Sequence, residues 1–214
     1  ELKNDEDVVL AAVTREGYSI QYASPTLRRD RDVVLAAVQN NGQAFGYIDN
    51  DLRNDRNIVL AAVEQDGYEL VWASPTLKAD REVVLAAVRT NGFALQFADP
   101  VLRADRGVVL AAIQNNGEAL MYASDELRTD KDFIISAVRI DGMVLRVSPP
   151  ELRADKDIVL TAVQNNGMTL QFASDELRAD EEVIQSAITQ DPRAERYAIR
   201  TRNFFGSFAS MFGF

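Results

Sequence analysis

One 25-residue unit recurs eight times along the chain without insertion or deletion, and this regularity constrains the fold more than any other feature. Counted from the first residue, the second place of every unit is Leu and the fifth is Asp, as in Leu102 and Asp105. The twelfth place is always Ala, and the seventeenth is Gly in every unit except the eighth, which has Pro192. Units of this kind bury their apolar faces only against their neighbours. The sequence therefore predicts a single stacked array over residues 1–200, followed by a separate tail over residues 201–214.

Each unit begins with the pattern of a capped helix. In the second unit, Asp30 precedes an apolar run and Gly42 follows it. Asp is favoured at a helix N-cap, and Gly just past the end suits a left-handed C-cap. We predict a helix of about 11 residues between them, lying between neighbours because apolar residues cover most of its circumference. The predicted capping aspartates are Asp5, Asp30, Asp55, Asp80, Asp105, Asp130, Asp155 and Asp180.

The second half of each unit is shorter and fits two kinds of structure. Residues 93–98 place apolar side chains on a helical face, but Leu95 and Phe97 also fit strand alternation. We favour a short helix, because Ala and Gln stand between them instead of β-branched residues. Ser24 followed by Pro25 then predicts one further helical turn. The predicted fold is an all-α solenoid, and the alternative is a β/α solenoid with a short strand in each repeat.

The composition excludes several kinds of chemistry. The chain has 33 acidic and 23 basic residues, a net charge of −10, which disfavours nucleic acids and anionic membranes as partners. It has no Cys and no His, so the commonest metal ligand and the commonest general base are missing. No Gly-rich phosphate-binding loop and no apolar run of roughly 20 residues is present. We expect no catalytic residues, no metal, no cofactor and no transmembrane segment.

A basic residue at the third place accompanies the Asp at the fifth in every unit, for example Arg103 and Asp105. One interpretation is a repeated ion-binding site. The other is structural, with the Asp capping the long helix and the basic side chain bound to helix carbonyls or to the Asp of the neighbouring unit. We favour the structural interpretation, because a binding site seldom needs eight identical copies.

Places that vary while their neighbours stay fixed indicate a binding surface in a solenoid. The eighteenth and twenty-first places vary most, lie three apart, and would face the same way on a helix. Alternatively, Tyr18 and Phe93 pack under the following unit. Trp72 occupies a place otherwise filled mostly by Tyr or Phe, and we predict that it lies in the core. The predicted partner-binding residues are Tyr18, Tyr68, Phe93, Met121, Met143 and Met168.

The tail departs from the repeat, and residues 203–214 carry no charged side chain. A solenoid needs a cap over its last apolar face, so folding back onto the array is the favoured interpretation. Docking into another protein is the second, and contact with a membrane surface is disfavoured because few basic residues are nearby. The five Phe residues proposed to cap or dock are Phe204, Phe205, Phe208, Phe212 and Phe214.

The whole unit resembles a tandem-repeat family known as domain of unknown function 4116. The resemblance is clearest in the fifth unit, at residues 102–105, 108–113, 115–120 and 122–124, and it covers about residues 1–190. Local departures occur, such as Ser-Pro-Pro at residues 148–150. The resemblance implies an intracellular, repeat-built interaction module, and it implies no reaction.

We therefore predict a non-catalytic protein–protein interaction or scaffolding module, an accessory component of a larger assembly. The alternative is an adaptor region of a regulatory or effector protein whose chemistry lies outside this chain. A third, disfavoured hypothesis is a hydrolase that uses carboxylates in a concave groove. The chain opens in phase with the repeat and without Met, which is compatible with a processed or an excised product.

Overall fold

The computed structural model describes residues 2–199, which fall into two compact units, residues 2–124 and residues 125–199. Each unit is a stack of helical repeats in which every long helix packs against the long helix of the next repeat, as α5 does against α7. No strand occurs among the described residues. The predicted all-α solenoid is confirmed, and the β/α alternative is wrong. The predicted Phe-rich tail lies outside the described residues.

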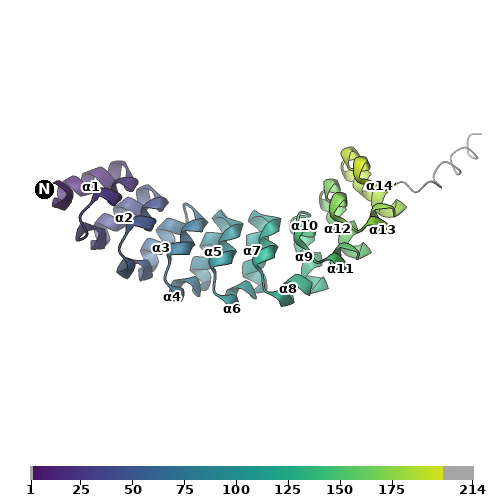
Figure 1. Ribbon diagram of the computed structural model, residues 1–214, viewed down its shortest axis with the longest axis horizontal. Coiled ribbons are helices and arrows are strands. Elements are labelled where there is room, and N and C mark those ends of the chain that lie inside the picture. The colour runs from purple at the N-terminus through teal and green to yellow at the C-terminus, as the bar shows by residue number, and fades with distance from the viewer. Residues whose placement is uncertain (1, 200–214) are drawn as a thin grey trace, which may run out of the picture. The chain divides into compact units, whose positions relative to one another are not determined.

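Each repeat contributes one long helix that begins after the Asp of the fifth place. In Figure 1 these helices stand side by side in chain order within each unit. All are 10 residues long except α3, which has 8, close to the predicted length of about 11. The long helices are α1 (Glu6–Arg15), α2 (Arg31–Asn40), α3 (Arg56–Val63), α5 (Arg81–Thr90), α7 (Arg106–Asn115), α9 (Lys131–Ile140), α12 (Lys156–Asn165) and α14 (Glu181–Gln190).

The second segment of each repeat is helical, as predicted, but it is a 3₁₀ helix in all repeats except the sixth. It begins at the Gly itself and runs for six residues. These segments are η2 (Gly17–Tyr22), η4 (Gly42–Tyr47), η6 (Gly67–Trp72), η7 (Gly92–Phe97), η8 (Gly117–Tyr122), α10 (Val144–Val147), η9 (Gly167–Phe172) and η10 (Pro192–Tyr197).

A one-turn helix links each repeat to the next long helix, as the Ser-Pro pattern predicts. Ser74 caps α4 by accepting a hydrogen bond from the Leu77 amide, and Pro75 occupies the first helical position. In Figure 1, α4 and α6 lie along the lower edge of the first unit. The links are η1 (Leu2–Asn4), η3 (Leu27–Arg29), η5 (Asn50–Asn54), α4 (Pro75–Lys78), α6 (Pro100–Arg103), α8 (Asp125–Thr129), α11 (Pro150–Arg153) and α13 (Asp175–Arg178).

The Gly at the seventeenth place is required by close packing between repeats, and the predicted left-handed C-cap is wrong. The long helix ends on an extended residue, such as Asn41 with φ −148°, and the Gly follows it. A Cβ on Gly67 would lie 2.0 Å from the carbonyl oxygen of Ala87 in the next repeat. A Cβ on Gly167 would lie 2.3 Å from the Ala187 oxygen. The invariant Gly and the invariant Ala therefore meet across each of these seams.

Where the fifteenth place is Asn or Gln, its side chain bonds the backbones of neighbouring repeats together. Asn115 accepts from the Gly92 amide at 2.7 Å through Oδ1, and its Nδ2 donates to the Arg89 carbonyl at 3.1 Å. Gln65 makes the equivalent bonds to Gly42 and Val38. This satisfies a buried amide and the free carbonyls at a helix end, two groups that would otherwise lack partners.

The core of each unit is a dry seam between long helices and the 3₁₀ segments. In the second repeat Val33, Val34, Ala37, Val38 and Phe45 are fully buried. The Leu at the second place is also buried in the second, fourth and fifth repeats, and it anchors the one-turn link to this core. The seam leaves the 3₁₀ segments with one face inward and one face toward solvent.

Candidate interaction surface

The aspartate of the fifth place stands at the N-cap of every long helix. Asp55 illustrates the geometry: its Oδ1 accepts from the amides of Asn57 and Ile58 at 2.9 and 3.2 Å. This satisfies two amides of the first helical turn. The residues whose carboxylates accept in this way are Asp5, Asp30, Asp55, Asp80, Asp105, Asp130, Asp155 and Asp180.

Several of these aspartates also pair with a cation of the preceding repeat, and this cation comes from the sixth place and not from the third. The aspartates with such an ion pair include Asp55, Asp80, Asp105, Asp155 and Asp180. Arg31 Nε lies 2.7 Å from Asp55 Oδ2, and Lys156 Nζ lies 2.8 Å from Asp180 Oδ2. The hydrogen bond from Lys156 lowers the pKa of Asp180, so this carboxylate stays ionised at neutral pH. We name Arg31, Arg56 and Arg81 of the first unit the paired row, because each contacts the capping Asp of the next repeat.

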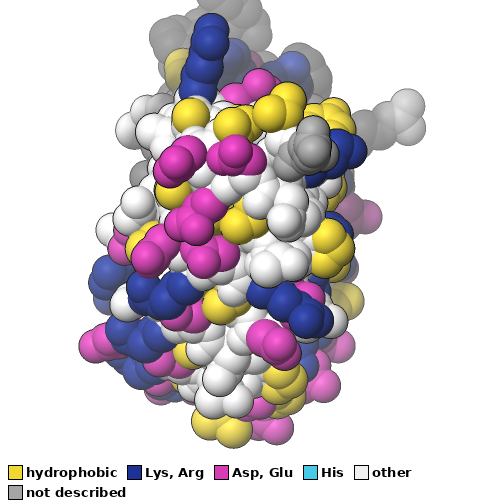
Figure 2. All heavy atoms as spheres, turned by 90° about the vertical axis from the view of Figure 1, so that its left-hand side faces the viewer, with side chains coloured by type: hydrophobic (Ala, Val, Ile, Leu, Met, Phe, Trp, Pro, Cys, Tyr) yellow, Lys and Arg dark blue, Asp and Glu magenta, His cyan; other side chains and the backbone are white. Residues whose placement is uncertain are grey.

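Figure 2 shows acidic and basic side chains interleaved over the visible face of the molecule. This pattern agrees with the short ion pairs between repeats. Exposed pairs of this kind contribute little stability individually, roughly 0–1 kcal/mol each.

The third-place cations of repeats two to five behave differently, and we name Arg28, Arg53, Lys78 and Arg103 the cation row. Within residues 2–199, none of them forms an ion pair with a carboxylate. The Nε atoms of the three arginines are buried without a hydrogen-bond partner in the described part of the chain. Lys78 Nζ donates to the Val71 carbonyl at 2.7 Å.

The cation row lies beside the aromatic residues of the twenty-second place. The Arg53 guanidinium carbon is 5.0 Å from the centre of the Trp72 ring. Burial lowers the pKa of Lys78, and the charge of Arg53 lowers it further, so these two neighbouring cations repel each other. A groove of about 170 Å³ brings Arg28 next to Tyr47 and Asp49 in the second repeat.

The eighteenth and twenty-second places form an aromatic ladder along the 3₁₀ segments of the first unit. Tyr68 packs edge-to-face on Phe97 of the next repeat, with ring centres 4.9 Å apart, and Phe93 packs on Tyr122 at 6.1 Å. Such contacts hold each ring in a fixed orientation. We define the aromatic face by the residues of this ladder in repeats two to five: Tyr47, Tyr68, Trp72, Phe93, Phe97 and Tyr122.

The predicted partner-binding residues divide into exposed and half-buried groups. Tyr68 is 49 % exposed and Met121 is 47 % exposed. Tyr18 is half-buried because it packs on Tyr47, and Phe93 is half-buried against the following repeat, as the packing alternative predicts. The remaining two, Met143 and Met168, are also half-buried.

The prediction that Trp72 lies in the core is wrong. Its side chain is 43 % exposed, and it leans over Gly46, where a Cβ would lie 3.5 Å from Trp72 Nε1. The aromatic preference of the twenty-second place reflects ring packing on the surface and not burial. The five tail phenylalanines named above lie outside the described residues.

Sequence reasoning missed Glu69, a buried carboxyl group on η6. The residue is only 7 % exposed, and its Oε2 atom has no hydrogen-bond partner in the described part of the chain. Burial, followed by the negative charge of Asp66, raises the pKa of Glu69 to about 7. The other repeats carry Ser, Ala, Val or Thr at this nineteenth place, so an isolated charge there was the available signal.

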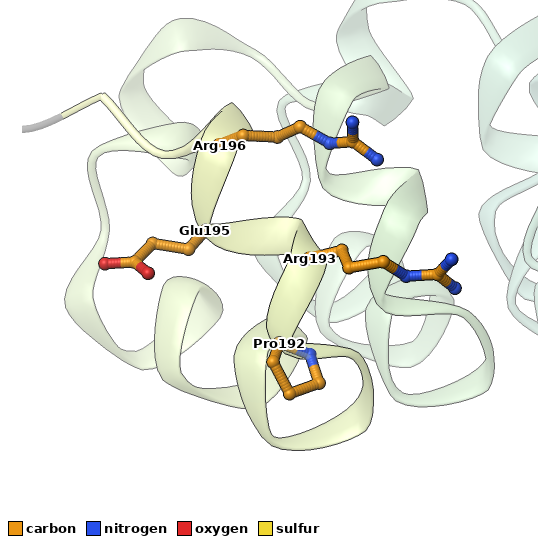
Figure 3. A pocket seen from close by; sticks show the side chains of 4 residues that line it. All are labelled: Pro192, Arg193, Glu195 and Arg196. Carbon is orange, nitrogen blue, oxygen red and sulfur yellow. The ribbon is translucent and has the colours of Figure 1, made fainter.

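A broad surface hollow of about 540 Å³ lies on η10, lined by Pro192, Arg193, Glu195 and Arg196. Figure 3 shows both arginines extending to one side of the helix and Glu195 pointing away from them. Arg193 Nη2 lies 2.8 Å from Asp191, and the Arg196 guanidinium stacks on the Tyr197 ring at 5.2 Å. Both cations therefore have partners within their own repeat.

Two kinds of site are absent from residues 2–199. No group of three or more acidic side chains is arranged to hold a metal ion. No described helix is long and apolar enough to cross a bilayer.

A family model described as Domain of unknown function (DUF4116) matches residues 1–28, 30–78, 55–103, 80–128, 105–153 and 155–199. These matches cover most of the chain. The chain belongs to this family. No curated protein and no solved structure matches it.

The DUF4116 matches follow the same period as the structure. Four of them start at residues 30, 55, 80 and 105, which are successive capping aspartates, and each spans two repeats. The DUF4116 unit therefore contains both sides of one seam between repeats, including the Gly–Ala contact described above.

Proposed function

We propose that this chain is a non-catalytic interaction module that holds a protein partner as part of a larger assembly. The observation that carries the proposal is the contrast between the structural places of the repeat and its exposed places. The capping aspartates and the Gly–Ala seam repeat almost unchanged, whereas the exposed 3₁₀ places differ from repeat to repeat. A uniform scaffold that presents variable side chains is typical of solenoids that bind proteins.

The chemistry of the exposed places supports the same role. Tyr68 and Trp72 are large and close to half exposed. Tyr68 packs edge-to-face on the Phe97 ring, and the Arg53 guanidinium lies over the Trp72 ring. Rigid aromatic side chains of this kind are enriched among the residues that dominate protein interfaces. The alternative, an adaptor region for chemistry outside this chain, uses the same surface and differs only in what is attached to it.

The test is quantitative affinity purification from the cells that produce the protein. The tagged chain is compared with Tyr68→Ala/Trp72→Ala and with Val101→Ala, a control that removes an exposed apolar side chain from a one-turn link. We expect the same partner with the parent and the control, and at least about tenfold less with the double variant. The partner is then purified, and its binary dissociation constant is measured by calorimetry for all three proteins.

A monodisperse monomer that captures no partner and turns over a small molecule would contradict the proposal. A partner whose affinity is the same for all three proteins would show that binding occurs away from the aromatic face.

A further inference from the structure

The cation row and the aromatic face run side by side along the first unit. Arg53 lies over Trp72, Arg28 shares a groove with Tyr47, and Lys78 donates to the carbonyl of Val71, the residue before Trp72. The two rows share the 25-residue period of the chain. A partner on this surface therefore meets one cation and at least one aromatic ring in each repeat.

Most of the charge of the cation row is not balanced by a carboxylate. The carboxylates of Asp55, Asp80 and Asp105 are bound by the paired row. Asp49 is bound by Arg29 at 2.9 Å, and the charge of the neighbouring Arg28 also acts on it, so Arg28 is partly balanced, whereas Arg53, Lys78 and Arg103 form no ion pair among the described residues. Screening at physiological ionic strength limits exposed charges to a range of about 8 Å. The local excess of positive charge therefore governs what this face attracts, although the net charge of the chain is −10.

The spacing of the row selects one conformation for an acidic ligand. Packed helices lie about 8–10 Å apart, so equivalent places in successive repeats, including the third place that carries these cations, recur at about this spacing. A polyproline II segment has three residues per turn and rises about 3.1 Å per residue, so every third side chain recurs after about 9 Å on the same face. A β-strand places every third side chain on the opposite face.

We propose that the first unit binds an extended acidic segment in the polyproline II conformation, with an acidic side chain at every third position on the cation row and proline rings on the aromatic face. This inference rests on the interaction role proposed above and specifies the partner. Aromatic-lined grooves bind such segments in other proteins because the ligand is already extended and loses little entropy on binding. A carboxylate forms charge-assisted hydrogen bonds with a guanidinium group, here through its terminal nitrogens because the Nε atoms are buried.

The probe is a synthetic peptide of six Asp-Pro-Pro units, titrated into the full chain by calorimetry and by Trp72 fluorescence. Trp72 is the only tryptophan and lies on the aromatic face, so its emission reports binding at the proposed place. Two comparison peptides have six Lys-Pro-Pro units, or six contiguous Asp followed by twelve Pro. We expect saturable binding of the first peptide, no binding of the lysine peptide, and at least about tenfold weaker binding of the contiguous peptide.

The variants separate the cation row from total charge. Arg53→Gln/Arg103→Gln removes two charges from the row, and Arg15→Gln/Arg89→Gln removes two exposed charges from the long helices. We expect at least about tenfold weaker binding for the first pair, less than about twofold change for the second, and restored binding for Arg53→Lys/Arg103→Lys. Circular dichroism confirms that each variant is folded.

Several results would overturn the inference. The inference is wrong if the Asp-Pro-Pro peptide does not bind, or if the contiguous peptide binds as tightly as the Asp-Pro-Pro peptide. It is also wrong if Arg53→Gln/Arg103→Gln and Arg15→Gln/Arg89→Gln weaken binding equally. Competition by a single-stranded oligonucleotide would assign the row to nucleic acid, and self-association lost in Arg53→Gln/Arg103→Gln would assign it to a second copy. If the peptide fails but the purified native partner still depends on Trp72, the partner class is wrong and the proposed function stands.

Discussion

Replacing Glu69 by Gln should remove the pH dependence that this residue imposes on stability. The carboxyl group is buried on η6, one of its oxygens has no hydrogen-bond partner among the described residues, and Asp66 adds a like charge. Each of these features disfavours the ionised form. The amide of Gln has nearly the same shape and carries no charge at any pH, so the variant removes only the titration.

The magnitude follows from the pKa of Glu69, which rises from 4.5 to about 7 in the folded chain. At about 1.36 kcal/mol per pKa unit, the ionised carboxylate destabilises the fold by roughly 3 kcal/mol. Between about pH 4.5 and 7 the folded chain binds a proton that the unfolded chain has released, so the free energy of unfolding falls as pH rises. Above about pH 7 the carboxylate is ionised in both states and the loss is complete.

The assay is urea denaturation of the parent and Glu69→Gln from pH 4 to pH 8, followed by Trp72 fluorescence. Trp72 is three residues away on the same 3₁₀ helix and is the only tryptophan, so the signal reports the unfolding of this repeat. We expect Glu69→Gln to be more stable by roughly 2–3 kcal/mol at pH 8 and about equal in stability at pH 4. Glu64→Gln, an exposed substitution in the same repeat, serves as the control.

Subtracting the two curves removes the titration of the capping aspartates, because both proteins share them. A constant difference across the pH range, or a variant less stable at pH 8, would refute the description of Glu69 as a buried unpaired carboxyl.

Five further substitutions test the helix caps and the seams between repeats, each by thermal and urea denaturation. Gly67→Ala should lower the free energy of unfolding by about 3 kcal/mol or more, because the new Cβ would lie 2.0 Å from a backbone oxygen. Gly107→Ala is the control. Its Cβ would meet mainly a flexible arginine side chain, so it should cost less than about 1 kcal/mol. Asn115→Leu should cost roughly 1–3 kcal/mol, because it leaves backbone groups of the neighbouring repeat unsatisfied, and a neutral result would contradict the bridging role. Asp80→Ala removes both the helix cap and the ion pair and should cost roughly 1–2 kcal/mol. Arg56→Ala removes only its ion pairs and should cost less than about 1 kcal/mol. Equal losses would show that the ion pair matters more than the cap.

The sequence predicts the parts of the fold that depend on local chemistry. Asp80 is recognisable as a cap because capping involves only the next three residues, and the recurrence at a fixed period makes one helix per unit a firm expectation. The Ser-Pro turn at Ser74 is predictable for the same reason. These features need no knowledge of the neighbouring repeat.

Features that depend on the next repeat were missed or misread. The Gly67 requirement comes from a carbonyl oxygen 20 residues away, and the Arg31–Asp55 pair joins residues 24 apart. Neither leaves a local pattern, although a basic sixth place in six of the eight units was a usable signal. Trp72 was assigned to the core because an aromatic preference is common to cores and to surface ladders.

The candidate surface was predicted only in part. Variation at the eighteenth and twenty-first places correctly indicated exposed residues such as Tyr68 and Met121, but it gave no indication that Arg53 stacks on an aromatic ring or lacks a carboxylate partner. The 3₁₀ geometry was also missed, because Ala and Leu do not distinguish a 3₁₀ turn from an α-helical one.

Hydrogen–deuterium exchange of the chain alone and bound to its purified native partner tests the central claim most directly. The account predicts slower amide exchange in the exposed 3₁₀ segments Gly67–Trp72 and Gly92–Phe97, with little change in the long helices α3 and α5 behind them. Protection confined to the long helices, or none in either segment, would contradict the claim that the variable 3₁₀ face is where this scaffold holds its partner.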